Sequence, residues 1–335
     1  MYYGKRALTL ATLIVFSTVN TVAAAQTFCS QTKSGFPEQW TDAIVSTISF
    51  FENSKEEPYY AAVTKDFDGQ GISAGLLQWN IGKESLQPLV RDIINTDEAK
   101  FDEIFGEYST EFKEAFRPKS TTLQLNWAKS LHTYKNPNSN NASVRGAKWN
   151  DKGKQIKSRL VELLQTPASK QQQDIRIAQL LGRAWNYSNW WIDQNPNRTA
   201  DSEPLRIQEV AFFADTLVFN GCWWKTANYS IVSDFINAHG DDEAKSKVIG
   251  YLTTDLSYRQ LQNNEAEKNY ELWKNKNLER WQLELLVFAY HISKNINKGH
   301  ARQFKKNVLS RRGTILLNDG WVNGKRYKNA SFPTK

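Results

Sequence analysis

The chain has 335 residues, of which 40% are hydrophobic and 23% charged, so it can bury the core of one large domain or of two joined lobes. Its 12 tryptophans, 13 tyrosines and 17 phenylalanines are more than packing alone readily explains. The 43 basic residues are spread along the chain among 35 acidic ones, a distribution that disfavours nucleic acid as a partner.

The first 25 residues have the pattern of a secretory signal. Lys5 and Arg6 precede an apolar stretch at 7–19, and Ala23-Ala24-Ala25 provides a cleavage site before Gln26. The apolar stretch is shorter than the ~20 residues of a bilayer-spanning helix. We therefore expect a secreted or periplasmic protein without stable membrane insertion after cleavage, and we favour a monomer. Its mature part, residues 26–335, keeps 41 basic and 35 acidic residues, a net charge of +6.

The first expected element of the mature chain is a helix over residues 37–51, whose apolar residues share one face. Residues 56–74 predict a small hairpin around the turn Asp68-Gly69-Gln70-Gly71. A buried helix is expected to begin at 76–79 and to resume after a break at 80–82.

Most of the remaining chain is expected to be helical, which predicts a mainly α (α+β) class: two lobes with a small β-hairpin or sheet beside a cleft. A polar segment near 135–153 is expected to be a loop at the boundary between the lobes. The other expected helices are 98–116, 123–131, 155–164, 172–191, 204–219, 241–280 and 281–292.

Two carboxylates mark the ends of the connection between the first helix and the hairpin turn. Glu52 ends the apolar helix, where partial burial would raise its pKa, and Asp68 lies in the glycine-containing turn. Taken singly, each is more often an ordinary surface residue. As a pair facing each other, they are what glycosidic bond cleavage requires.

The motifs around this pair resemble the lysozyme superfamily, and most of all its chitosanases. The shared patterns are Glu52-Asn53-Ser54, an Asp-Gly-x-Gly turn, and Ser73 ahead of Gly75-Leu76-Leu77-Gln78. The resemblance implies a two-lobed lysozyme-like fold in which Glu52 is the acid, and Asp68, helped by Ser73, is the base of an inverting hydrolysis. This family commonly has threonine at the position of Ser73.

Further site residues follow from burial and from the resemblance. Asp215 lies within an apolar helix and needs a cationic partner, for which Arg311 and Arg312 are the candidates, with Arg302 as a third. The resemblance implies that these groups support Glu52. Residues near the carboxylates that we expect to bind substrate are Tyr60, Gln78, Trp79 and Asn80. Aromatic residues that serve either as sugar-stacking surface or as core are Trp185, Trp190, Trp191, Trp223 and Trp224.

The two cysteines, Cys29 and Cys222, are expected to form one disulfide in an oxidising compartment, with two unpaired thiols as the alternative. No metal or cofactor is expected. The four histidines are scattered, and the calcium-loop pattern that starts at Asp66 has Gln70 and Leu77 where ligands are required.

The expected substrate is a β-1,4-linked amino-sugar polymer. A net charge of +6 would repel cationic chitosan and attract the carboxylates of peptidoglycan, so we favour a muramidase-like enzyme, with a chitosanase as the alternative. Glu52 with the Gly-Leu-Leu-Gln pattern also resembles lytic transglycosylases. A catalytically inactive glycan-binding protein is a further alternative.

Overall fold

The computed structural model describes residues 35–55, 57–66, 68–117, 120–139, 145–196, 198, 204–221, 228–254, 261–296, 305–328 and 332, without the side chains of 261–263. Several sequence predictions lie outside these residues: the signal sequence at 1–25, the Cys29–Cys222 disulfide, and the roles of Trp223, Trp224 and Arg302.

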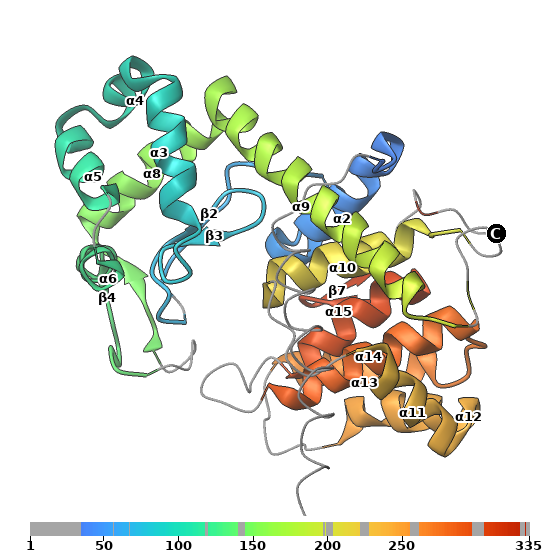
Figure 1. The fold of residues 1–335 in the computed structure, drawn as a ribbon. Helices are drawn as coiled ribbons and strands as arrows, with labels where there is room; N and C mark the ends of the chain where they lie inside the picture. The colour runs from blue at the N-terminus through green and yellow to red at the C-terminus, as the bar shows by residue number, and fades with distance from the viewer. Residues whose placement is uncertain are drawn as a thin grey trace, which may run out of the picture.

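The described chain has two hydrophobic cores, and Figure 1 shows its elements as two groups. We call the part of the chain that surrounds one core, from β1 to α8, the sheet lobe. The part that surrounds the other core is the helical lobe, which combines α2 with the elements from α10 to β7. The predicted mainly α class with small antiparallel sheets is confirmed. None of the described helices combines the length and the apolar composition that crossing a membrane requires.

The sheet lobe is built around a three-stranded antiparallel sheet in the order β1-β2-β3. Thr64 pairs with Ser73, and Ser73 pairs with Asn80 on its other side. The elements of this lobe are β1 (Val63–Thr64), β2 (Ser73–Ala74), β3 (Trp79–Asn80), α3 (Leu86–Thr96), α4 (Glu98–Phe105), η2 (Gly106–Tyr108), α5 (Ser109–Phe116), α6 (Thr121–Ser130), β4 (His132–Thr133), β5 (Lys148–Trp149) and α8 (Asp151–Gln165).

The lobes are joined by α9 (Pro167–Asp193), whose 27 residues give it a length of about 40 Å. Its first half contacts the sheet lobe through Arg176, which pairs with Asp92 of α3 at 2.5 Å. Its second half contributes Leu180, Leu181 and Trp191 to the core of the helical lobe. Figure 1 shows α9 running from one lobe to the other.

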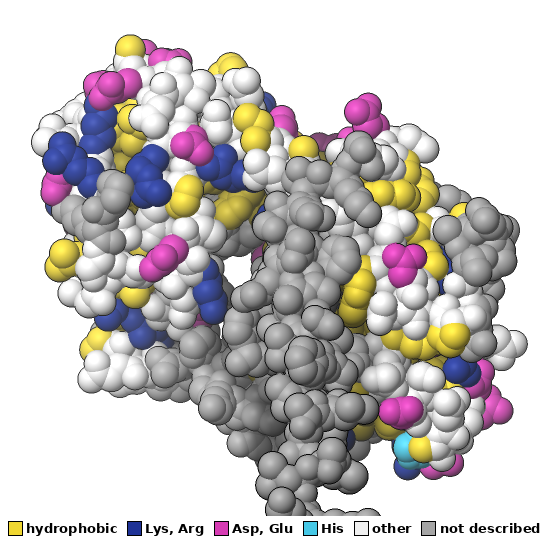
Figure 2. Space-filling model, in the orientation of Figure 1, with side chains coloured by type: hydrophobic (Ala, Val, Ile, Leu, Met, Phe, Trp, Pro, Cys, Tyr) yellow, Lys and Arg dark blue, Asp and Glu magenta, His cyan; other side chains and the backbone are white. Residues whose placement is uncertain are grey.

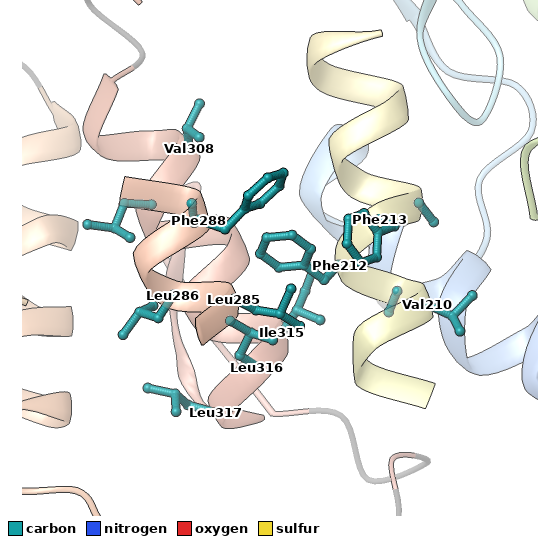
Figure 3. Packing of buried hydrophobic residues seen from close by; sticks show 14 of the residues in the cluster. Val210, Phe212, Phe213, Leu285, Leu286, Phe288, Val308, Ile315, Leu316 and Leu317 are labelled. Atoms are coloured by element: carbon teal, nitrogen blue, oxygen red, sulfur yellow. The ribbon is translucent and has the colours of Figure 1, made fainter. Parts of the chain in front are cut away.

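The helical lobe surrounds α10, which is almost wholly buried, as the sequence predicts. Phe212 of α10 and Phe288 of α14 meet with ring centroids 5.9 Å apart, between the helices (Figure 3). Each such buried side chain contributes about 1.5–3 kcal/mol. The elements of this lobe are η1 (Glu38–Trp40), α2 (Thr41–Asn53), α10 (Ile207–Asn220), α11 (Tyr229–His239), α12 (Asp241–Gly250), η3 (Tyr251–Thr253), α13 (Leu261–Trp273), α14 (Arg280–Asn295), α15 (Lys305–Leu317), β6 (Gly320–Val322) and β7 (Lys325–Tyr327).

The prediction of a helix starting at 76–79 is wrong. Gly75 and Gln78 have φ values of +80° and +52°, and these left-handed residues turn the chain into β3. The next helix, α3, begins only at Leu86. Left-handed backbone also divides the predicted helix at 98–116, because Gly106 has a φ of +51° between α4 and α5.

The lobe boundary does not lie at the polar segment near 135–153, as we had expected. Leu131 and Ile156, on either side of that segment, belong to the same core. The described part of the segment instead includes β5, which pairs with β4 just before the segment. Helix α8 begins at Asp151, four residues earlier than predicted, because the side chain of Asn150 accepts a hydrogen bond from Gly153 N and caps it.

Candidate active site

Glu52 lies in the last turn of α2, at the edge of the helical lobe. The helix stops because Ser54 adopts a φ of +55°, while its amide still donates to Phe50 O at 2.8 Å. Neighbouring Phe51 is buried in the core, whereas the side chain of Glu52 keeps 15% of its surface exposed. The carboxyl group is therefore largely desolvated and still accessible.

Arg311 of α15 joins Glu52 to Asp215 of α10. Its Nη2 donates to Glu52 Oε1 and to Asp215 Oδ1, both at 2.5 Å, and its Nε donates to Asp215 Oδ1 at 2.9 Å. Burial acts to lower the pKa of Arg311, but the carboxylates of Asp215 and Glu52 outweigh it and raise that pKa. The structure thus brings together three residues that we had expected to share a network.

Arg312, the second arginine of the predicted network, lies behind Asp215 and has no surface exposure. Its Nε is 3.7 Å from Asp215 Oδ2, and its Nη2 donates to Asn220 Oδ1. Within the described structure its Nε and Nη1 make no hydrogen bond. Burial lowers the pKa of Arg312 to about 10, which means that the buried site destabilises the charged form of its guanidinium.

The surroundings of Glu52 favour its protonated form. Burial raises the pKa of Glu52; the charge and hydrogen bond of Arg311 oppose this effect, and the negative charge of Asp215 adds to it. The net direction is upward, so the carboxyl keeps its proton at a higher pH than an ordinary glutamate does. An acid catalyst near neutral pH requires this property.

The backbone around Glu52 is fixed by residues far away in the sequence. Asn323, in the turn between β6 and β7, donates from Nδ2 to Phe51 O at 2.6 Å, and Lys325 Nζ donates to Ser54 O at 3.1 Å. Asn53 donates from Nδ2 to Leu76 O at 2.9 Å. The helix end is therefore tied both to the C-terminal hairpin and to the segment between β2 and β3. Our sequence reasoning missed Asn323, although an Asn-Gly pair is a hairpin-turn signal.

Asp68 lies in the turn between β1 and β2, partly exposed, with its Oδ1 accepting from Gln70 N at 3.1 Å. Ser73 follows on β2 and is buried. Since Asn53 contacts Leu76, just beyond the other end of β2, the strand leads from the end of α2 past Ser73 toward the turn of Asp68. The strand therefore links the end of α2, which carries Glu52, with the turn that carries Asp68.

The four predicted substrate-binding residues make hydrogen bonds or packing contacts within the protein, around the three-stranded sheet. Tyr60 donates from its hydroxyl to Asp174 Oδ1 at 2.6 Å. Gln78 accepts from Thr64 Oγ1 and donates to Gly75 O, and Asn80 Oδ1 accepts from Lys83 N. Trp79 is partly buried and packs against both hydrophobic cores, so it lies where the two lobes meet.

Gln173 of α9 is a residue that the sequence did not single out. It is fully buried, its Oε1 accepts from Leu76 N at 3.0 Å, and its Nε2 donates to Tyr60 O at 3.3 Å. The helix between the lobes thus fixes the backbone on both sides of β1 and β2. No sequence signal distinguishes Gln173 from the glutamines beside it.

Three of the tryptophans considered as sugar-stacking surface are described. Trp191 is 1% exposed and belongs to the core. Trp185 and Trp190 are partly buried, and Trp185 makes an edge-to-face contact with Trp40 at 6.0 Å. The part of the chain that the structure describes contains no group of three or more His, Cys, Asp or Glu residues arranged to hold a metal ion.

No family model matches the chain, and no curated protein matches it. Comparison with solved structures finds the family 46 chitosanase of Gynuella sunshinyii in complex with chitotetraose, at 13% identity and a TM-score of 0.42, covering 85% of this chain and 88% of that one. A chitosanase complex follows at 15% identity, a TM-score of 0.40 and coverages of 86% and 95%. Chitosanase OU01 with substrate matches at 17% identity and a TM-score of 0.38, covering 86% of this chain and 94% of that one. Because these TM-scores are below 0.5, we infer function from the residues of this chain.

Proposed function

We propose that the protein is a glycoside hydrolase that cleaves an amino-sugar polymer, with Glu52 as the general acid and Asp68 as the general base. The observation that carries the proposal is the state of Glu52. It is a largely buried carboxyl at a helix end, with a raised pKa and a guanidinium 2.5 Å from one of its oxygens. The motifs that place Asp68 and Ser73 after it supply the second carboxylate and a hydroxyl.

In the proposed reaction, Glu52 donates its proton to the glycosidic oxygen as the bond to the anomeric carbon breaks. Asp68 removes a proton from a water that attacks the opposite face of the sugar, and Ser73 helps to position that water. Glu52 is then an anion next to Arg311, whose charge stabilises it. The environment therefore serves both states: burial and Asp215 favour the acid before transfer, and Arg311 stabilises the carboxylate after it.

We further propose peptidoglycan as the substrate. The mature chain carries a net charge of +6, and the carboxylates of peptidoglycan would be attracted to it, while cationic chitosan would be repelled. In the face shown in Figure 2, Lys and Arg side chains gather on the sheet lobe among fewer Asp and Glu side chains. Export through the predicted signal sequence would bring such an enzyme to the cell wall.

Chitosan is the alternative substrate, because the Glu-Asn-Ser and Asp-Gly-x-Gly patterns resemble those of chitosanases. Zymography on peptidoglycan, beside a reducing-end assay on chitosan, separates the two. Clearing of peptidoglycan supports the proposal, and release of reducing ends from chitosan alone selects the alternative.

The same digests test the remaining alternatives. Mass spectra of the peptidoglycan products distinguish hydrolysis, which leaves reducing ends, from a lytic transglycosylase, which leaves anhydro-muramic ends. Binding of both polymers without turnover would indicate a catalytically inactive glycan-binding protein and would contradict the proposed reaction.

A further inference from the structure

Two aspartates stand two residues apart at the hairpin turn, and the structure gives them different surroundings. Asp68 is partly exposed, whereas Asp66 has no surface exposure. Asp66 Oδ1 accepts from Gly69 N at 2.8 Å and from Gly71 N at 3.2 Å. Its Oδ2 accepts two further hydrogen bonds from side chains of the sheet lobe. With four donors on two oxygens, Asp66 has no capacity left for a substrate or a water.

We propose that Asp66 is a positioning residue that holds Asp68 in place for catalysis, and that Tyr134 and Arg145 hold Asp66 in turn. This inference rests on the proposed function, since it assigns Asp68 the role of the base. It goes beyond that function by naming three residues that neither the motifs nor the sequence analysis connected with the reaction.

The hydrogen bonds of Asp66 fix the backbone that immediately follows Asp68. Gly69 and Gly71, whose amides donate to Asp66, have φ values of +90° and +77°. A Cβ atom at Gly71 would lie 3.2 Å from Leu125 Cδ2 and 3.3 Å from Ala128 Cβ, so the turn also packs closely against α6. The backbone conformation of the turn that carries Asp68 is therefore held by a buried carboxylate.

Arg145 supplies the charge that balances Asp66. It is 3% exposed, and its Nη2 donates to Asp66 Oδ2 at 2.8 Å, while its Nη1 donates to Ser139 O at 3.1 Å. Its own carbonyl oxygen accepts from Lys135 N and Asn136 N. The arginine thus links the turn of Asp68 to the loop that follows β4, so the two segments are held as one unit.

Two more side chains complete the surroundings of Asp66. The hydroxyl of Tyr134 donates to Asp66 Oδ2 at 2.9 Å, and its ring lies under the guanidinium of Arg145 at 4.9 Å. His132 accepts from the backbone amide of Asp66 at its Nε2 and donates from Nδ1 to Ala128 O at 2.8 Å. Both the side chain and the backbone of Asp66 are therefore anchored.

The test uses conservative variants, because removing one partner of a buried ion pair strongly destabilises a protein. Tyr134→Phe deletes one hydrogen bond to Asp66. Arg145→Lys keeps the charge but cannot keep the separate guanidinium hydrogen bonds to Asp66 Oδ2 and Ser139 O. The matched control is Arg176→Lys, which alters an arginine–aspartate pair between α9 and α3, away from the turn. For each full-length variant, kcat and KM on the cleaved polymer are measured together with hydrogen exchange of the amides in residues 65–72.

We expect Tyr134→Phe and Arg145→Lys to lower kcat about 10- to 100-fold, because a small misplacement of a reacting group is costly, with KM changed less than about threefold. The amides of Gly69 and Gly71 should exchange faster in both variants, and Arg176→Lys should keep the wild-type kcat.

A wild-type kcat in both variants despite faster exchange would overturn the inference while leaving the proposed function intact. A loss of kcat in Arg176→Lys as large as in Arg145→Lys would also overturn it, because the effect would then be general destabilisation. If the unmodified protein cleaves neither polymer, the proposed function fails first, and the positioning role of Asp66 fails with it. Because Tyr134→Phe removes only one hydroxyl, it provides the test even if Arg145→Lys does not fold.

Discussion

Arg311 Nη2 lies 2.5 Å from Glu52 Oε1 and also 2.5 Å from Asp215 Oδ1, so a single nitrogen connects the candidate acid to a fully buried carboxylate. Within this group of charges, Glu52 is the only carboxyl that reaches the surface of the described structure. Its proton affinity therefore depends on the balance between burial, one guanidinium and one carboxylate. Replacing either carboxyl should change that balance in a measurable direction.

Compared with the unmodified protein, Glu52→Gln should become more stable as the pH rises toward neutral. The pKa of Glu52 is raised in the folded state, so the folded protein binds its proton more tightly than the unfolded chain does, and stability falls as the pH rises through that range. Glutamine does not titrate, so the variant avoids this loss. The gain is about 1.4 kcal/mol for each tenfold increase in proton affinity. Thermal unfolding of both proteins from pH 4 to pH 7 should show the variant's advantage growing with pH; an advantage that shrinks would mean that the pKa of Glu52 is not raised.

Asp215→Asn should lower the pKa of Glu52, because the negative charge of Asp215 raises that pKa. The positive charge of Arg311 would then be balanced by the carboxylate of Glu52 and no longer by that of Asp215. The alkaline limb of the kcat/KM profile, which reports loss of the acid's proton, should therefore move to lower pH. The variant should also lose about 3–5 kcal/mol of stability, since Arg311 and Arg312 lose their shared carboxylate. Denaturant unfolding and a pH–rate profile measure the two effects, and an alkaline limb shifted upward would refute this account of the network.

Gly75→Ala should destabilise the region where the lobes meet. Gly75 has a φ of +80°, and a Cβ there would lie 2.7 Å from the ring of Trp79 and 2.8 Å from Gln173 Oε1. Gly240→Ala is the matched control, because Gly240 has a φ of +71° with nothing within 4 Å of its Cβ position. Backbone strain of about 1–2 kcal/mol is common to both variants. Only Gly75→Ala should cost more than that in denaturant unfolding, and equal losses would show that the contact is unimportant.

Local chemistry made part of the site predictable. Asp215 lies in an apolar helix, and the cost of burying a lone charge indicates a cationic partner whatever the fold. Two of the three candidate arginines, Arg311 and Arg312, are adjacent in the sequence, so the sequence could not assign their roles. Successive helical residues point in directions about 100° apart, and that difference brings Arg311 to both carboxylates and leaves Arg312 beside Asp215 alone.

The missed residues act over long sequence separations. Gln173 contacts Leu76 across 97 positions, and Asn323 contacts Phe51 across 272. Such contacts depend on how the lobes assemble, and local sequence patterns do not predict that assembly. The mistaken prediction of a helix at 76–79 has a local cause instead. The apolar residues around Gln78 are typical of a helix, but Gln78 adopts a left-handed conformation and turns the chain into β3.

The most direct test of the central claim is the rate at which the unmodified protein and Glu52→Gln release reducing ends from peptidoglycan and from chitosan. The matched control is Glu57→Gln, the same change at an exposed glutamate five positions further along. We predict that the unmodified protein and Glu57→Gln cleave one of the polymers and that folded Glu52→Gln is at least about 10²-fold slower, as loss of a general acid requires. A Glu52→Gln rate equal to that of the unmodified protein would contradict the claim.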